Sequence, residues 1–208
     1  MSNISIKLLC RLIVVSALLL ISAGCSDHKA EDAATFNEGA AAFTKGDYGV
    51  ALEKFTSLAD RGNAAAQYNL GVMYKQGKGV PADTQKTIEL WTKAADQGNN
   101  AAAQFNLGLL YRQGKGVPAD DGQAVSYWSK AAEQGHNVAQ MYLGIMYAQG
   151  SGIAMDKVQA YKWFSISAEN GSRGAAQNLT TVSLHMEPAQ IEQGKTLAKK
   201  WLADHPSK

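Results

Sequence analysis

One short pattern in this chain has the spacing of a motif for nucleophilic catalysis. Ser26 and Lys29 form S-x-x-K, in which the serine attacks a carbonyl group and the lysine assists it. The partner motif K-T-G is absent, and the pair stands beside Cys25 in a polar segment where no pocket can hold it. We therefore expect no catalysis at this serine.

The remaining residues that could take part in catalysis or metal binding also lack the partner residues that such sites require. Gly194-Lys195-Thr196 is similar to the end of a phosphate-binding loop, but Ala189 stands where the motif requires its first glycine. The four histidines show no pair with metal-ligand spacing, so we expect them to be solvated or to cap helices: His28, His136, His185 and His205. The sequence predicts no catalytic residues, no metal site and no cofactor.

The elements that could position a site come from an internal repeat. Three segments align almost without gaps: LGVMYKQGKGVPAD from residue 70, LGLLYRQGKGVPAD from residue 107 and LGIMYAQGSGIAMD from residue 143. Their first glycines, Gly71, Gly108 and Gly144, lie 37 and 36 residues apart. A period in this range indicates a stack of similar units, each packed on its neighbours.

Each unit is predicted to be two antiparallel helices. Ala66, Leu70, Met73 and Tyr74 recur at helical spacing, and the G-x-G pair after them ends this first helix. An aspartate then stands where the N-cap of a second helix belongs, in each copy: Asp83, Asp120 and Asp156. The apolar face of the second helix is Leu90, Trp91, Ala94 and Ala95, and Gly98 closes the unit.

Gly71 falls inside a predicted helix, where glycine costs about 1 kcal/mol relative to alanine. Gly108 and Gly144 repeat this cost. We expect close helix approach to offset it, with rings of the Trp91 type filling the space beside each glycine.

Taken together, these residues resemble the Sel1-like repeat (SLR) family, a relative of the tetratricopeptide repeat. The first copy carries the pattern at Ala66, Leu70, Gly71, Tyr74, Gly77, Gly79, Val80, Asp83, Trp91, Ala94 and Ala95. The third copy departs mildly, at Ile153, Phe164 and Ser167. The resemblance implies an all-α fold, a right-handed α-solenoid of about four to five stacked antiparallel helix pairs. It implies protein–protein contacts and no reaction.

The first 24 residues differ in composition from the repeats. Lys7 and Arg11 flank the start of an apolar run from Leu12 to Ile21, which is short for a membrane span and typical of a signal peptide. The run ends in small residues before Cys25, which resembles the lipobox of bacterial lipoproteins, with Ser22 in place of the usual leucine. The resemblance implies lipidation of Cys25, and Ser26 after it favours the outer membrane.

We expect a protein on the periplasmic side of the bacterial cell envelope, held to the membrane by this lipid. A soluble periplasmic or secreted protein and an uncleaved anchor remain alternatives. The expected organisation is a signal peptide (1–24), a tether (25–33), an N-terminal tetratricopeptide-like cap (34–62), three repeats (63–99, 100–135, 136–171) and degenerate C-terminal capping helices (172–205).

The charge balance argues against a nucleic-acid partner, and the cysteine content argues against disulfide bonds within the repeats. Removing residues 1–24 takes away Lys7 and Arg11 and leaves eighteen basic and eighteen acidic residues, so the mature chain lacks the basic excess of a nucleic-acid-binding protein. The cysteines are Cys10 and Cys25, so no disulfide can form within the repeats.

The predicted function is binding of a protein or peptide on the concave face of the stack, which successive first helices line. One stripe on these helices contains Asn69, Val72, Gln76, Asn106, Leu109, Gln113, Tyr142, Ile145 and Gln149. These residues are either a partner-binding surface or an interface partly covered by the neighbouring unit. We expect a non-catalytic envelope adaptor; the alternatives are a secreted or surface-exposed interaction factor and, ranked last, a β-lactam-binding or hydrolysing repeat protein.

Overall fold

The computed structural model describes residues 29–206, and these contain helices and no strand. The chain divides into two compact units, one ending at Arg61 and the other beginning at Gly62. The predicted all-α class is confirmed. Cys25 and the apolar run before it lie outside the described residues. Within the described part of the chain, no helix is both long and apolar enough to cross a bilayer.

In the first unit, the described residues form a pair of helices. One helix occupies residues 29–45, including residues 29–33 of the expected tether, and α2 follows over Tyr48–Asp60. Gly46 turns the chain with φ +86°, and Asp47 caps α2 by accepting a hydrogen bond from the Val50 amide. The rings of Phe36 and Phe55 pack 5.6 Å apart between the two helices.

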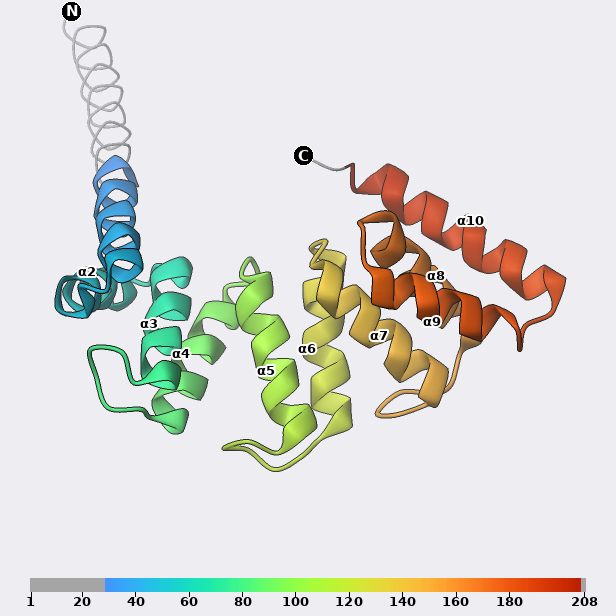
Figure 1. The fold of residues 1–208 in the computed structure, drawn as a ribbon, viewed down its shortest axis with the longest axis horizontal. Coiled ribbons are helices and arrows are strands. Elements are labelled where there is room, and N and C mark those ends of the chain that lie inside the picture. The colour runs from blue at the N-terminus through green and yellow to red at the C-terminus, as the bar shows by residue number, and fades with distance from the viewer. Residues whose placement is uncertain (1–28, 207–208) are drawn as a thin grey trace, which may run out of the picture. The chain divides into compact units, whose positions relative to one another are not determined.

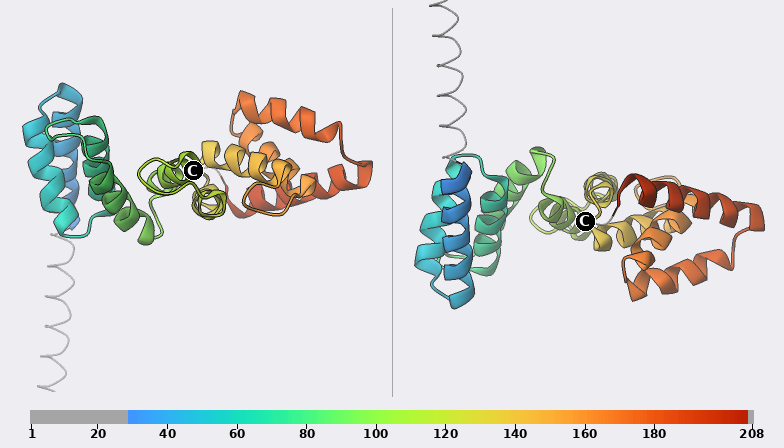
Figure 2. Two further views of the ribbon diagram at one scale, coloured as in Figure 1. Left: turned by 90° about the horizontal axis from the view of Figure 1, so that it is seen from below. Right: turned by 90° about the horizontal axis from the view of Figure 1, so that it is seen from above.

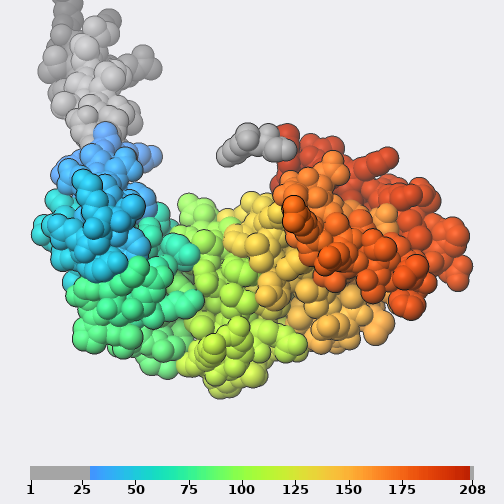
Figure 3. Space-filling view, viewed as in Figure 1, coloured from blue at the N-terminus to red at the C-terminus, as the bar shows by residue number. Residues whose placement is uncertain are grey.

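The second unit is a succession of helices that confirms the predicted stack of helix pairs (Figure 1). The helices are α3 (Ala64–Gln76), α4 (Thr84–Asp96), α5 (Ala101–Gln113), α6 (Asp121–Glu133), α7 (Asn137–Gln149), α8 (Lys157–Glu169), α9 (Arg173–Ser183) and α10 (Pro188–Asp204). From α3 to α9 each helix packs on the next one in the chain. Figure 3 shows the surfaces of successive repeats in direct contact along this unit.

Aspartate side chains begin the second helix of each repeat, and left-handed glycines end the first. The predicted aspartates at the second helices are confirmed, since Asp83, Asp120 and Asp156 each accept backbone N–H bonds in the first turn of α4, α6 and α8. The first helices α3, α5 and α7 end at glycines in the left-handed region: Gly77, Gly114 and Gly150. The repeat boundaries therefore follow from local hydrogen bonding.

The mid-helix glycines allow close approach, as predicted. A Cβ atom on Gly71 would lie 2.6 Å from the Trp91 ring, and one on Gly144 would lie 2.6 Å from the Phe164 ring. Gly108 meets Trp128 in the same way. With the ring this close, the Trp91 indole N–H donates to the Tyr68 carbonyl oxygen at 3.1 Å. The helix-propensity cost of each glycine is offset by this packing.

The loops between paired helices contact the preceding repeat. A Cβ atom on Gly116 would collide with Thr84 and Ile88 at the start of α4, and the Gln85 amide donates to the Gly116 carbonyl oxygen at 2.9 Å. Gly152 lies against the backbone of Asp121, at the start of α6. The second glycine of these G-x-G loops therefore joins one repeat to the one before it.

The last helix closes the far end of the stack. Figures 1 and 2 show α10 turning back along the last repeat, where it packs on α8. Trp201 and Ala198 join the buried core there, and the Trp201 ring lies 5.9 Å from the Trp163 ring. The Trp201 indole N–H also donates to a carboxylate oxygen of Glu133 at 2.7 Å.

A buried glutamine in each first helix forms a second repeating feature. Gln67, Gln104 and Gln140 are at most 6% exposed. The side-chain oxygens of Gln67 and Gln104 accept hydrogen bonds from Gln97 and Gln134, each thirty residues further on. The oxygen of Gln140 has no partner, because Asn170, one methylene shorter than glutamine, stands at the third donor position.

Candidate functional site

The residues with catalytic potential are separated in the structure. Among the described residues, no group of three or more His, Cys, Asp or Glu side chains could hold a metal ion. His136 caps α7, with its Nδ1 accepting from the Ala139 amide at 3.2 Å, and it stacks on Phe105 at 4.7 Å. Burial lowers the pKa of the His136 imidazole, which keeps Nδ1 free to accept this bond.

The two motif matches have ordinary surroundings where they are described. Lys195 and Thr196 lie within α10, where the ammonium of Lys195 pairs with Glu192 at 2.7 Å and the Thr196 hydroxyl donates to the Glu192 carbonyl oxygen at 2.8 Å. A helical backbone bonded in this way offers no loop of free N–H groups to a phosphate. Ser26 lies outside the described residues.

The stripe predicted on the first helices divides into two kinds of residue. Gln76, Gln113 and Gln149 are exposed, and each is the last residue of its helix. The other six residues of the stripe are half-buried: Asn69, Val72, Asn106, Leu109, Tyr142 and Ile145. The accessible part of the stripe is therefore a row of glutamines with one member in each repeat.

Contacts between neighbouring repeats explain this division. Val72, Leu109 and Ile145 pack against the buried clusters of the adjoining helices. Asn106 donates to the Ala102 carbonyl oxygen at 2.9 Å and to the Tyr68 hydroxyl at 3.4 Å. The neighbouring unit therefore covers part of the stripe, which is one of the two alternatives that the sequence left open.

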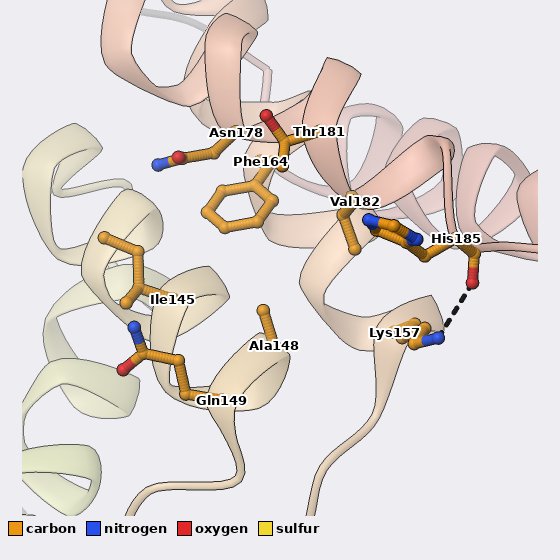
Figure 4. Close-up of a pocket in the computed structure, with 9 residues that line it drawn as sticks. All are labelled: Ile145, Ala148, Gln149, Lys157, Phe164, Asn178, Thr181, Val182 and His185. Atoms are coloured by element: carbon orange, nitrogen blue, oxygen red, sulfur yellow. Dashed lines mark hydrogen bonds between the residues drawn. The ribbon is translucent and has the colours of Figure 1, made fainter.

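A pocket of about 250 Å³ lies at the end of the stripe, between α7, α8 and α9. Figure 4 shows Ile145 and Gln149 on one wall, Asn178 and Thr181 on the opposite wall, and Phe164 between them. Ala148, Val182, Lys157 and His185 complete the lining. The pocket therefore combines an apolar interior with amide, hydroxyl and basic groups, and two members of the predicted stripe belong to it.

The motifs gave no signal for the four lining residues that follow Ser172, because the repeat pattern has decayed there. In the register of the N-caps His136 and Ser172, Thr180 stands where the three repeats carry their mid-helix glycine. Position 178 gave no signal by itself, because its equivalents in the three repeats are Asn69, Asn106 and Tyr142.

Comparison with known proteins gives one family and several similar structures. The Sel1 repeat family profile matches residues 64–99, 101–136 and 137–172, just over half of the chain. A Sel1 repeat protein from Oxalobacter formigenes is 35% identical with a TM-score of 0.60, over 62% of this chain and 97% of that one. Helicobacter pylori cysteine rich protein B shares the fold, with a TM-score of 0.51 at 23% identity, over 62% of this chain and 95% of that one.

Two further relatives differ more in extent. The c5321 protein, a protective antigen present in uropathogenic Escherichia coli strains that displays an SLR fold, is 30% identical with a TM-score of 0.53. That similarity covers 83% of this chain and 45% of c5321. DAP3-binding cell death enhancer 1 of Mus musculus is 44% identical over 57 residues, which are 27% of this chain and 11% of that protein. The chain thus matches about a tenth of this curated relative.

Proposed function

Because this chain belongs to the Sel1 repeat family, we propose that it is a non-catalytic adaptor of the bacterial cell envelope that binds a partner protein. Sel1 repeat proteins are generally scaffolds for protein interactions, and their fold is typically non-catalytic. The proposed binding face is the one formed by the first helices α3, α5 and α7.

The row of exposed glutamines carries this proposal. Gln76, Gln113 and Gln149 stand at the same position in three successive repeats, beside half-buried apolar residues of the stripe. A primary amide both donates and accepts hydrogen bonds without adding charge. Three such groups, repeated at the spacing of the layers, suit the backbone of a partner segment that runs across the repeats.

The envelope location rests on the N-terminal sequence. Positive residues, an apolar run and small residues before Cys25 follow the order of a lipoprotein signal. We propose that Cys25 carries the lipid and that the chain is an outer-membrane lipoprotein on the periplasmic side. Labelling with radioactive palmitate should be lost in Cys25→Ser, whereas the same label in Cys10→Ser should persist.

Site-directed photo-crosslinking in intact cells tests the binding face. A crosslinking amino acid at position 76, 113 or 149 should capture the same partner. Matched probes at exposed positions on the second helices, Lys93 and Lys130, should not capture it. Equal capture from both sets of positions would mean that the partner does not use the first-helix face.

A second candidate is a surface-exposed interaction factor. It is favoured by the similarity to c5321, which is described as a protective antigen. Protease added to whole cells distinguishes the two locations, because an adaptor facing the periplasm is protected until the outer membrane is permeabilised. Digestion in intact cells would favour the surface-exposed factor.

A further inference from the structure

The pocket between α7, α8 and α9 exists because the third repeat lacks a ring that the first two contain. In the first repeat, Tyr68 stacks on Trp91 with ring centres 5.9 Å apart. In the second, Tyr142 from the next first helix packs on Trp128 at 4.9 Å. One tyrosine thus covers each tryptophan, and the space above the ring is filled.

Neither covering position holds a ring around Phe164. The position equivalent to Tyr68 is Met141, and the position equivalent to Tyr142 is Asn178. The ring at 164 is itself a phenylalanine in place of tryptophan. No aromatic ring therefore stands at either covering position, and Phe164 and Asn178 both line the pocket of about 250 Å³.

The ionisable groups at the rim of the pocket are basic. Lys157 and His185 are the ionisable residues of the lining, which contains no Asp or Glu. The Lys157 ammonium donates to the His185 carbonyl oxygen at 2.8 Å, which holds it at the rim and leaves it further N–H donors (Figure 4). An anionic group near the opening would be attracted to this ammonium.

Exposed apolar side chains stand at the same corner. Leu184 is 77% exposed and directly precedes His185, and Met155 is 61% exposed and lies two residues before Lys157. The bond from the Lys157 ammonium to the His185 carbonyl oxygen joins the two chain segments that carry these residues, and neither Leu184 nor Met155 is among the residues that line the pocket. Exposed apolar groups of this size beside a polar rim are typical of interaction sites.

We propose that this pocket receives one apolar side chain of a partner polypeptide, with an adjacent acidic residue of that partner paired to Lys157. The pocket is smaller than the roughly 300–1,000 Å³ typical of sites for drug-sized ligands, which favours a single side chain over a cofactor. The inference rests on the proposed function and specifies the kind of segment that the first-helix face would hold at its α7 end.

Fluorescence anisotropy with the full-length chain in detergent tests the proposal. The probes are labelled glycine-serine peptides that carry Leu or Ser next to Asp, Asn or Lys. The Leu-Asp peptide should bind most tightly, roughly tenfold more tightly than Leu-Asn, because it alone can pair with the ammonium. Equal binding of Leu-Asp and Ser-Asn peptides would overturn the proposal.

Two variants separate pocket binding from loss of structure. Asn178→Tyr restores the ring found at the equivalent Tyr142, so it should fill the pocket and abolish binding without lowering the melting temperature. Lys157→Glu should reverse the preference, so that Leu-Lys binds more tightly than Leu-Asp, which a destabilised protein would not do. Unchanged peptide binding in Asn178→Tyr would place the contact elsewhere.

Other occupants give distinct results. Binding of laurate that is lost in Asn178→Tyr, with no peptide binding, would assign the pocket to a fatty acyl chain. Loss of self-association in Asn178→Tyr would assign it to a second copy of this chain. Either result overturns the proposal. If the peptides do not bind while probes at positions 76 and 113 still crosslink to the partner, the proposed adaptor function stands and the pocket assignment is wrong.

Discussion

Replacing Asn170 with glutamine should stabilise the protein, because it supplies the hydrogen bond that Gln140 lacks. Gln97 and Gln134 cap the C-termini of α4 and α6 and donate to buried glutamines thirty residues earlier. Asn170 is the equivalent residue at the end of α8. Its backbone carbonyl oxygen already accepts from the Asn137 amide at 2.9 Å, and the substitution leaves this bond in place.

The expected gain is about 1 kcal/mol. A net intramolecular hydrogen bond contributes about 0.5–1.5 kcal/mol, and a buried polar atom without a partner costs about 1–3 kcal/mol. Gln140 is fully buried, and its amide nitrogen already donates to the Ala132 carbonyl oxygen at 3.2 Å, so its free oxygen is held in place to accept. For a unit of this size, a gain of 1 kcal/mol raises the melting temperature by roughly 2–4 °C.

Thermal and urea unfolding followed by circular dichroism would measure the change. The matched control is Gln134→Asn, which shortens the donor to Gln104 and should destabilise by about 1–3 kcal/mol. In a Gln140→Met background the acceptor is gone, so Asn170→Gln should add no stability. A gain that persists in that background, or Gln134→Asn as stable as the parent, would refute the hydrogen-bond explanation.

Three further predictions concern packing, pH and the terminal helix. Gly108→Val should destabilise by about 1–3 kcal/mol in thermal melting because the new side chain would overlap Trp128, whereas Gly49→Ala, whose Cβ would make only an ordinary contact with Asp47 at 4.0 Å, should not. Since burial lowers the folded-state pKa of His136, stability should fall as pH drops below about 6.5; urea titrations should show less of this loss in His136→Asn, which keeps the cap. Trp201→Ala should cost about 3–5 kcal/mol and increase amide hydrogen exchange in α10.

Much of the fold could be predicted because its rules are local. An aspartate after a G-x-G loop caps a helix wherever it occurs, and a repeated mid-helix glycine implies a ring close beside it. Asp83, Gly77 and Gly71 therefore predicted the helix bounds and the approach of Trp91. The last helix, α10 over Pro188–Asp204, lies within residues 172–205, for which the sequence predicted capping helices.

The pairs that connect separate helices were not predicted. Gln134 reaches Gln104 across thirty residues, and Trp201 reaches Glu133 across sixty-eight. Each of these side chains is ordinary in its own helix, and only the stacking of layers brings the pairs together. The burial of part of the stripe has the same origin, because whether Val72 and Leu109 contact solvent depends on the repeat packed beside them.

The pocket shows why a stack of near-identical layers acquires a specific site where its copies differ. When successive repeats carry the same rings, each layer fills the space beside the next, as Tyr142 does against Trp128. Phe164 replaces the tryptophan of the first two repeats, and Asn178 stands where Tyr142 does in the preceding layer. The hollow lined by these two residues lies where no ring packs on Phe164, because close-packed side chains cannot expand to replace a missing ring. Under the proposed function, specific recognition would depend on where the repeats differ, and the row of shared glutamines would supply contacts that any copy could make.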